Sequence, residues 1–134
     1  MKVTNFEDLR IWQMASELCV KIYKVTRNGE FKYDDRFVQQ IRSSSGSIMD
    51  NIAEGFERQG NKEFKYFLFI AKGSAGETRS QIIRAHDVGF IDDETYSELY
   101  NDCIRLSASI NSFIQSLKKS DYKGTRYNAI PQGA

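Results

Sequence analysis

The chain has 134 residues and one proline, Pro131, which lies near its C-terminal end. Proline interrupts helices because it lacks a backbone N–H group and its ring clashes with the preceding turn. The rest of the sequence repeats apolar residues at spacings of three and four, which is the period of an amphipathic helix. A chain with this period and without internal prolines is predicted to be all-α.

Three glycines divide the chain into four helical segments, and they are Gly29, Gly60 and Gly89. Glycine readily adopts the left-handed backbone conformation that ends many helices. The implied connections are short, and short connections between long helices make neighbouring helices antiparallel. The sequence therefore predicts a single-domain, antiparallel up-down-up-down four-helix bundle over residues 1–119, followed by a polar C-terminal tail at 120–134.

The first and last helices carry start signals. Thr4 followed by Glu7 has the spacing of a capping box, and Ile91 and Tyr96 flank Asp92 as a hydrophobic staple flanks a helix cap. The last helix then alternates apolar spacings of three and four, which is typical of a bundle packing face. This seam contains Tyr96, Leu99, Cys103, Leu106, Ile110, Phe113 and Leu117.

Charge and composition restrict the class of protein. Nineteen Lys and Arg residues against eighteen Asp and Glu residues leave a net charge of +1, so any attraction to nucleic acid must come from local patches. Cys19 and Cys103 are expected to be buried free thiols in a reducing compartment. No apolar run approaches the roughly 20 residues that a membrane span needs, so a cytoplasmic protein without a membrane partner is expected.

The sequence lacks the catalytic motifs that would be expected of an enzyme with this fold. Di-iron bundles use Glu-x-x-His pairs, but the single histidine, His86, follows Ile83 at the position where Glu would be needed. The sequence also has no P-loop and no Gly-x-Ser-x-Gly motif. We therefore expect no catalytic residues, no metal ligands and no cofactor.

A polar stripe runs beside the apolar stripe of the second helix. The apolar stripe contains Ile41, Ile48, Ile52 and Gly55, and the polar one contains Gln40, Ser47, Asn51, Glu54 and Arg58. Asn51 and Glu54 either bond to the third helix, with Glu77 or Arg79 as partners, or face a ligand. We favour the first interpretation, in which Ser47, Asn51, Glu54 and Glu77 form a structural polar motif.

The small residues at 43–47 are expected to lie inside the second helix rather than in a linker, because helical apolar spacing continues on both sides of them. Gly46 costs a helix about 1 kcal/mol relative to alanine. We expect close packing of another helix to compensate for this cost.

Basic residues share one face of the third helix, opposite its apolar stripe, and they are Lys62, Lys65, Lys72 and Arg79. Arg58 lies just before them. The same outer face is expected to carry Tyr66, Phe69, Gly73 and Gly76. Basic and aromatic side chains together suit nucleic acid, with charges on phosphates and rings on bases. Aromatics and glycines equally suit a helix from a second subunit, and the two uses are compatible.

Several motifs in order resemble one known family. They are the segment at 5–9 with Trp12, the run Asn51-Ile52-Ala53-Glu54-Gly55, and Ile70-Ala71-Lys72-Gly73-Ser74 followed by Glu77. These motifs resemble the four-helix-bundle proteins encoded within 23S rRNA intervening sequences, which are similar in turn to the accessory variability proteins of diversity-generating retroelements. The resemblance covers residues 5 to about 118. Ser44 and Ser45 replace alanines that are usual in the family.

The resemblance implies a homo-oligomer, a ring-like pentamer, and RNA or DNA as a partner of its basic surfaces. The near-neutral charge departs from the strongly basic retroelement proteins. Two functions follow as hypotheses: a non-enzymatic, oligomeric, RNA-associated bundle, or an oligomeric scaffold that binds a protein partner.

Overall fold

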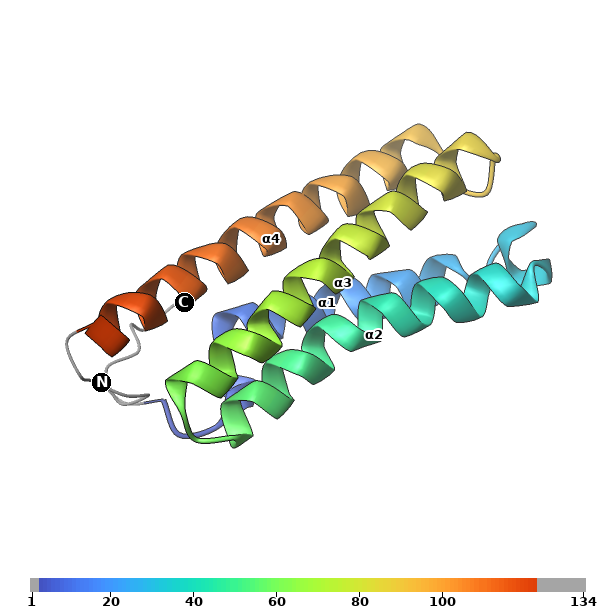
Figure 1. The fold of residues 1–134 in the computed structure, drawn as a ribbon. Coiled ribbons are helices and arrows are strands. Elements are labelled where there is room, and N and C mark those ends of the chain that lie inside the picture. The colour runs from blue at the N-terminus through green and yellow to red at the C-terminus, as the bar shows by residue number, and fades with distance from the viewer. Residues whose placement is uncertain (1–2, 123–134) are drawn as a thin grey trace.

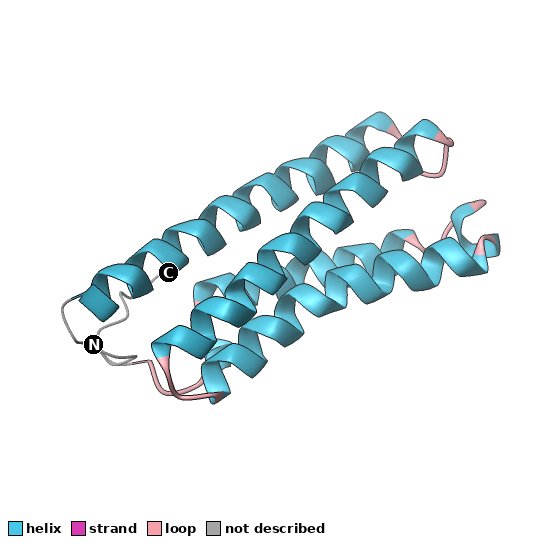
Figure 2. Ribbon diagram, viewed as in Figure 1, coloured by secondary structure: helices cyan, strands magenta, loops and turns pink. Residues whose placement is uncertain are grey.

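Four long helices and two short 3₁₀ helices make up residues 3–122, the part of the chain that the computed structural model describes. In chain order they are η1 (Phe6–Asp8), α1 (Arg10–Val25), η2 (Phe31–Tyr33), α2 (Asp35–Glu57), α3 (Asn61–Asp87) and α4 (Asp93–Tyr122). No strand occurs among these residues, and short loops join the helices (Figure 2). The all-α prediction is confirmed.

Successive helices run in opposite directions, which confirms the antiparallel up-down-up-down bundle (Figure 1). Helix α3 packs against both α2 and α4, whereas α1 packs mainly against α2 and less against α4. α4 continues to Tyr122, past the boundary expected at residue 119, and the rest of the predicted tail lies outside the described residues. Over the described part of the chain, no helix is long and apolar enough to cross a membrane.

Helix ends follow the expected local signals at most positions. The Asp34 side chain accepts a hydrogen bond from the Phe37 backbone N–H at 3.1 Å and so caps α2. Asp92 accepts from the Thr95 backbone N–H at 2.8 Å before α4, and this bond holds the pKa of the Asp92 carboxyl below its usual value. Gly89 has a φ of +83° after α3, as a helix-terminating glycine should. Between α2 and α3, however, the residue with positive φ is Gln59 rather than Gly60.

The predicted start of the first helix is wrong. α1 begins at Arg10 after the η1 turn, and the residue before it, Leu9, caps it without a side-chain hydrogen bond. Leu9 is buried, and the rings of Phe6 and Trp12 pack 5.4 Å apart across the turn. Burial of these apolar groups, rather than a capping box at Thr4, therefore determines where α1 begins and how the preceding chain leads into it.

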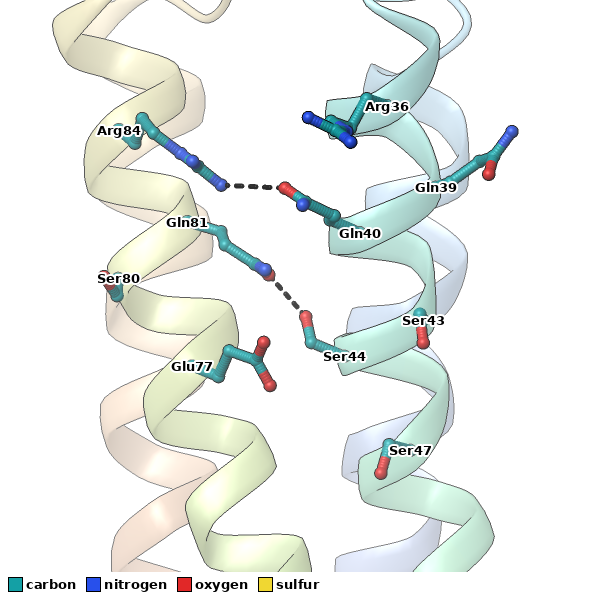
Figure 3. A pocket seen from close by; sticks show the side chains of 10 residues that line it. All are labelled: Arg36, Gln39, Gln40, Ser43, Ser44, Ser47, Glu77, Ser80, Gln81 and Arg84. Atoms are coloured by element: carbon teal, nitrogen blue, oxygen red, sulfur yellow. Dashed lines mark hydrogen bonds between the residues drawn. The ribbon is translucent and has the colours of Figure 1, made fainter.

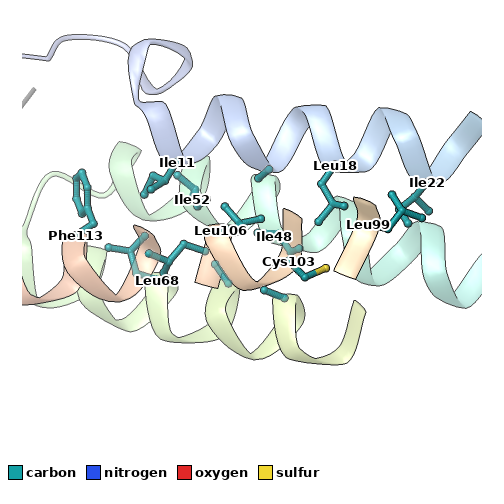
Figure 4. Close-up of a cluster of buried hydrophobic side chains, with 14 of the residues drawn as sticks. Ile11, Leu18, Ile22, Ile48, Ile52, Leu68, Leu99, Cys103, Leu106 and Phe113 are labelled. Carbon is teal, nitrogen blue, oxygen red and sulfur yellow. The ribbon is translucent and has the colours of Figure 1, made fainter. Parts of the chain in front are cut away.

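The core consists of apolar side chains from all four long helices (Figure 4). The seam predicted on the last helix is buried from Leu99 to Leu117, and Tyr96 packs at its edge. Three rings close one end of the core: Phe31 of η2 lies 5.0 Å from both Phe37 and Phe90. The sequence patterns did not indicate that Phe31 is fully buried, because its 3₁₀ turn is too short to show a period.

The two cysteines are free thiols, with Cys103 buried and Cys19 partly exposed. Burial raises the pKa of the Cys103 thiol from its ordinary 9.0 to about 12, and burial also raises the pKa of Cys19. A thiol with a raised pKa in the folded state ionises first in the unfolded chain. The contribution of Cys103 to stability is therefore intact below about pH 9 and is lost as the pH rises toward 12.

We predict that iodoacetamide at pH 8 modifies Cys103 of the native protein only as fast as the chain unfolds, because the thiolate is the reactive form. Partly exposed Cys19 should react earlier. Mass spectrometry of digested samples follows both sites, and the same reaction in 6 M guanidinium gives the unfolded rate as a control. Equal rates at Cys103 in native and unfolded protein would contradict its burial.

Candidate nucleic-acid interface

The basic residues of α3 lie beside α4 rather than opposite the core, which corrects the expectation for Lys72 and Arg79. The Lys72 ammonium donates to Asn111 Oδ1 at 3.3 Å, and the Arg79 guanidinium lies 5.9 Å from the Tyr100 ring centre. Residues seven apart on a helix drift by about 20° per step, so Lys65, Lys72 and Arg79 follow one flank of α3. Lys62 is exposed, whereas these three are half-buried.

Two of the charges on this flank, those of Lys72 and Arg79, meet neutral partners. Among the side chains that the structure describes, at residues 3–119, neither of them forms an ion pair. α4 contributes a third such cation, Lys118, whose ammonium lies 5.6 Å from the Phe69 ring centre. We call Lys72, Arg79, Lys118 and their partners Tyr100 and Asn111 the α3–α4 edge. Because no described carboxylate pairs with Lys72, Arg79 or Lys118, these cations can bind phosphates.

Arg58 differs from these three cations. Its guanidinium lies 2.9 Å from the Glu54 carboxylate and 3.8 Å from that of Glu63, and it stacks over the Phe67 ring at 5.1 Å. Two carboxylates therefore balance its charge, which makes Arg58 a poorer phosphate ligand than the sequence suggested.

The outer surface of α3 carries the aromatic and glycine residues expected there. Tyr66 is 62% exposed and Phe69 is 50% exposed. A Cβ atom built on Gly73 or Gly76 would have no neighbouring atom within 4 Å. We call these four residues the outer strip. It offers two rings beside an open, nearly flat backbone, next to the cations of the α3–α4 edge.

The polar stripe of α2 has other partners than those predicted. Asn51 donates to the Ser47 backbone oxygen at 2.8 Å, within its own helix, and Glu54 pairs with Arg58. Glu77 and Arg79 are therefore not their partners: Arg79 faces α4, and Glu77 is exposed. Ser47 does reach α3, through a 2.9 Å hydrogen bond between its hydroxyl and that of Ser74.

A buried polar network between α2 and α3 was missed by the sequence reasoning. The Ser44 hydroxyl accepts from Thr78 Oγ1 at 2.9 Å and donates to Gln81 Oε1. All three side chains are buried. Their position within the apolar stripes was the available signal, because polar residues on a core face need hydrogen-bond partners.

The described residues contain no group of three or more His, Cys, Asp or Glu side chains that could hold a metal ion. His86 is half-buried; its ring lies 2.7 Å from the Asp93 carboxylate and stacks on Tyr96 at 4.4 Å. The absence of catalysis and of cofactors stays a prediction.

Fold and surface together define a four-helix-bundle protein with a cationic edge. The chain belongs to the 23S rRNA-intervening sequence protein family, whose model matches residues 7–112. It is similar to the crystal structure of a protein with unknown function from the S23 ribosomal protein family of Bacteroides thetaiotaomicron VPI-5482, with 27% sequence identity and a TM-score of 0.72. That similarity covers 78% of this chain and 98% of the other. No curated protein matches the chain.

Proposed function

We propose that this protein is a non-enzymatic homo-oligomer, a pentamer, that associates with RNA in the cytoplasm through the α3–α4 edge. The observation that carries the proposal is the row of cations with neutral partners, Lys72, Arg79 and Lys118. Family membership supports it, because the family is described by its link to 23S rRNA intervening sequences.

Physical chemistry favours this edge for an RNA backbone. Cations that neutralise phosphates release counterions, which makes the affinity salt-dependent. The exposed rings of Tyr66 and Phe69 lie on the neighbouring outer strip, where bases could stack on them. A chain with a net charge of +1 offers only a modest local patch, and assembly into an oligomer would multiply it.

We predict that the triple variant Lys72→Gln, Arg79→Gln, Lys118→Gln binds a structured RNA about tenfold more weakly than the natural protein. The slope of log affinity against log salt should fall by about 2, since each lost phosphate contact removes about 0.7 to 0.9. A fluorescence titration at several salt concentrations measures both quantities.

The matched control is the triple variant Arg10→Gln, Lys24→Gln, Lys32→Gln, which removes the same charge from exposed positions away from the edge. It should bind RNA like the natural protein. If the two triple variants lose affinity equally, only bulk charge matters. If the edge variant titrates like the natural protein, the edge does not bind RNA.

The open strip of α3 favours a second function, an oligomeric scaffold for a protein partner. We predict that Gly73→Leu dissociates the assembly, because a leucine side chain would stand where another subunit packs against the strip. The fold of one chain should tolerate the change, since no atom lies within 4 Å of the added Cβ.

Light scattering gives the assembled mass, and thermal unfolding checks the fold of the Gly73→Leu variant. A variant that keeps its full mass would place the interface elsewhere. If the Gly73→Leu variant loses RNA binding together with its assembled mass, the two functions depend on one another.

A further inference from the structure

A wide polar groove of about 830 Å³ opens between α2 and α3, on the flank of α3 away from the α3–α4 edge (Figure 3). All ten residues that line it are polar or charged. Ligand sites typically occupy about 300 to 1,000 Å³, so the groove has room for a small molecule. Serines rather than large side chains leave the space open between the two helices, Ser43, Ser44 and Ser47 on α2 and Ser80 on α3.

One end of the groove is cationic. Arg36 of α2 and Arg84 of α3 line it from opposite sides (Figure 3). The Arg84 guanidinium packs 4.2 Å from the Phe37 ring centre and donates to Gln40 Oε1 at 3.4 Å. Neither arginine forms an ion pair with any residue of the described chain. Two uncompensated guanidinium groups facing one space suit a phosphate, which they can bind with paired hydrogen bonds.

The middle of the groove holds a buried amide. Gln81 is only 7% exposed, and its Oε1 accepts from the Ser44 hydroxyl at the groove floor (Figure 3). Its Nε2 makes no hydrogen bond with the described residues, and it is not among their buried unsatisfied polar atoms, so it is open to the solvent of the groove. A ligand acceptor in the groove would take this donor's hydrogen bond in place of water.

The far end carries a carboxylate, Glu77. Glu77 and Arg84 are seven residues apart on α3, a distance of about 10 Å along the helix axis. From one end to the other, the groove therefore offers guanidinium groups, amides and hydroxyls, then a carboxylate. A bare phosphate would use only the first of these. A nucleotide would use all of them, because amide side chains pair with base edges and a carboxylate accepts from hydroxyl or amino groups.

We propose that the α2–α3 groove binds a single nucleotide, with its phosphate on Arg36 and Arg84 and its base against Gln81. The nucleotide is either a free nucleoside monophosphate or the 5′-phosphorylated end of an RNA. The groove and the α3–α4 edge lie on different flanks of α3, so this binding does not depend on the proposed backbone contacts.

Calorimetric titration of the full chain with AMP, GMP, CMP, UMP and inorganic phosphate tests the groove. At least one nucleotide should bind saturably and more tightly than phosphate. The variant Arg36→Gln, Arg84→Gln should bind it at least tenfold more weakly, whereas Arg10→Gln should bind it normally. Both groove arginines are exposed, and an unchanged melting temperature would show that the double variant is folded.

A tetranucleotide with and without a 5′-phosphate distinguishes the two sources. If the phosphorylated tetranucleotide binds more tightly than any monophosphate, the natural ligand is an RNA end. If the two bind equally tightly, the natural ligand is a free nucleotide. The proposal is overturned if no nucleotide binds, if phosphate binds equally well, or if the double variant binds normally. The α3–α4 edge variant should keep nucleotide binding, so that failure of one proposal leaves the other measurable.

Discussion

Replacement of Phe64 by alanine is expected to lower the free energy of unfolding by about 3 to 5 kcal/mol. Phe64 of α3 is fully buried, and its ring lies 5.9 Å from that of Phe56 on α2 and 5.3 Å from that of Phe113 on α4. Its removal would leave a cavity where three helices meet. Since domains are stable by only about 5 to 15 kcal/mol, the loss is large, and urea unfolding followed by circular dichroism would measure it.

The matched control is Phe69→Ala, five residues further along the same helix. Phe69 is half exposed and meets the Lys118 ammonium at its ring face. Losing an exposed contact of this kind costs about 1 kcal/mol or less. Equal losses in the two variants would contradict the assignment of the inner and outer faces of α3. If the outer strip contacts RNA or another subunit, Phe69→Ala should weaken that contact while the fold persists.

Features decided by neighbouring residues could be predicted from the sequence. The caps at Asp34 and Asp92, the turn at Gly89 and the apolar seam of α4 depend on residues within a few positions of one another. Because all four helices are long and end at such local signals, the bundle follows from them.

Features that depend on how one helix is rotated against the next could not be predicted. The spacing of Lys72 and Arg79 defines a row on α3, but it does not reveal whether α4 covers that row. The Ser44–Thr78–Gln81 network could not be predicted for the same reason, because its partners belong to different helices and meet only when the two helices pack in one register. The candidate phosphate ligand Lys118 was missed for this reason: it lies on α4, next to Phe69.

The glycines of α2 also show that helix packing could not be predicted from the sequence. Sequence reasoning expected close packing at Gly46, but no atom lies within 4 Å of a Cβ built there. The closely approached glycine is Gly55, where a Cβ would lie 2.7 Å from Phe67 Cβ and 3.0 Å from Phe64 Cδ1. Helical period placed Gly55 on the core stripe, but only the packing of α3 shows that this position has no room for a methyl group.

Gly55→Ala is therefore expected to lower the free energy of unfolding by about 1 to 3 kcal/mol, through overpacking against α3. Gly46→Ala should instead raise it by about 0.4 to 1 kcal/mol, because alanine favours the helix and restricts the unfolded chain. Both glycines lie inside α2, so the intrinsic effect of the substitution is common to the two variants. The difference between their unfolding free energies thus measures the contact with Phe67 and Phe64 alone. Two variants of equal stability would mean that α3 does not approach α2 at Gly55.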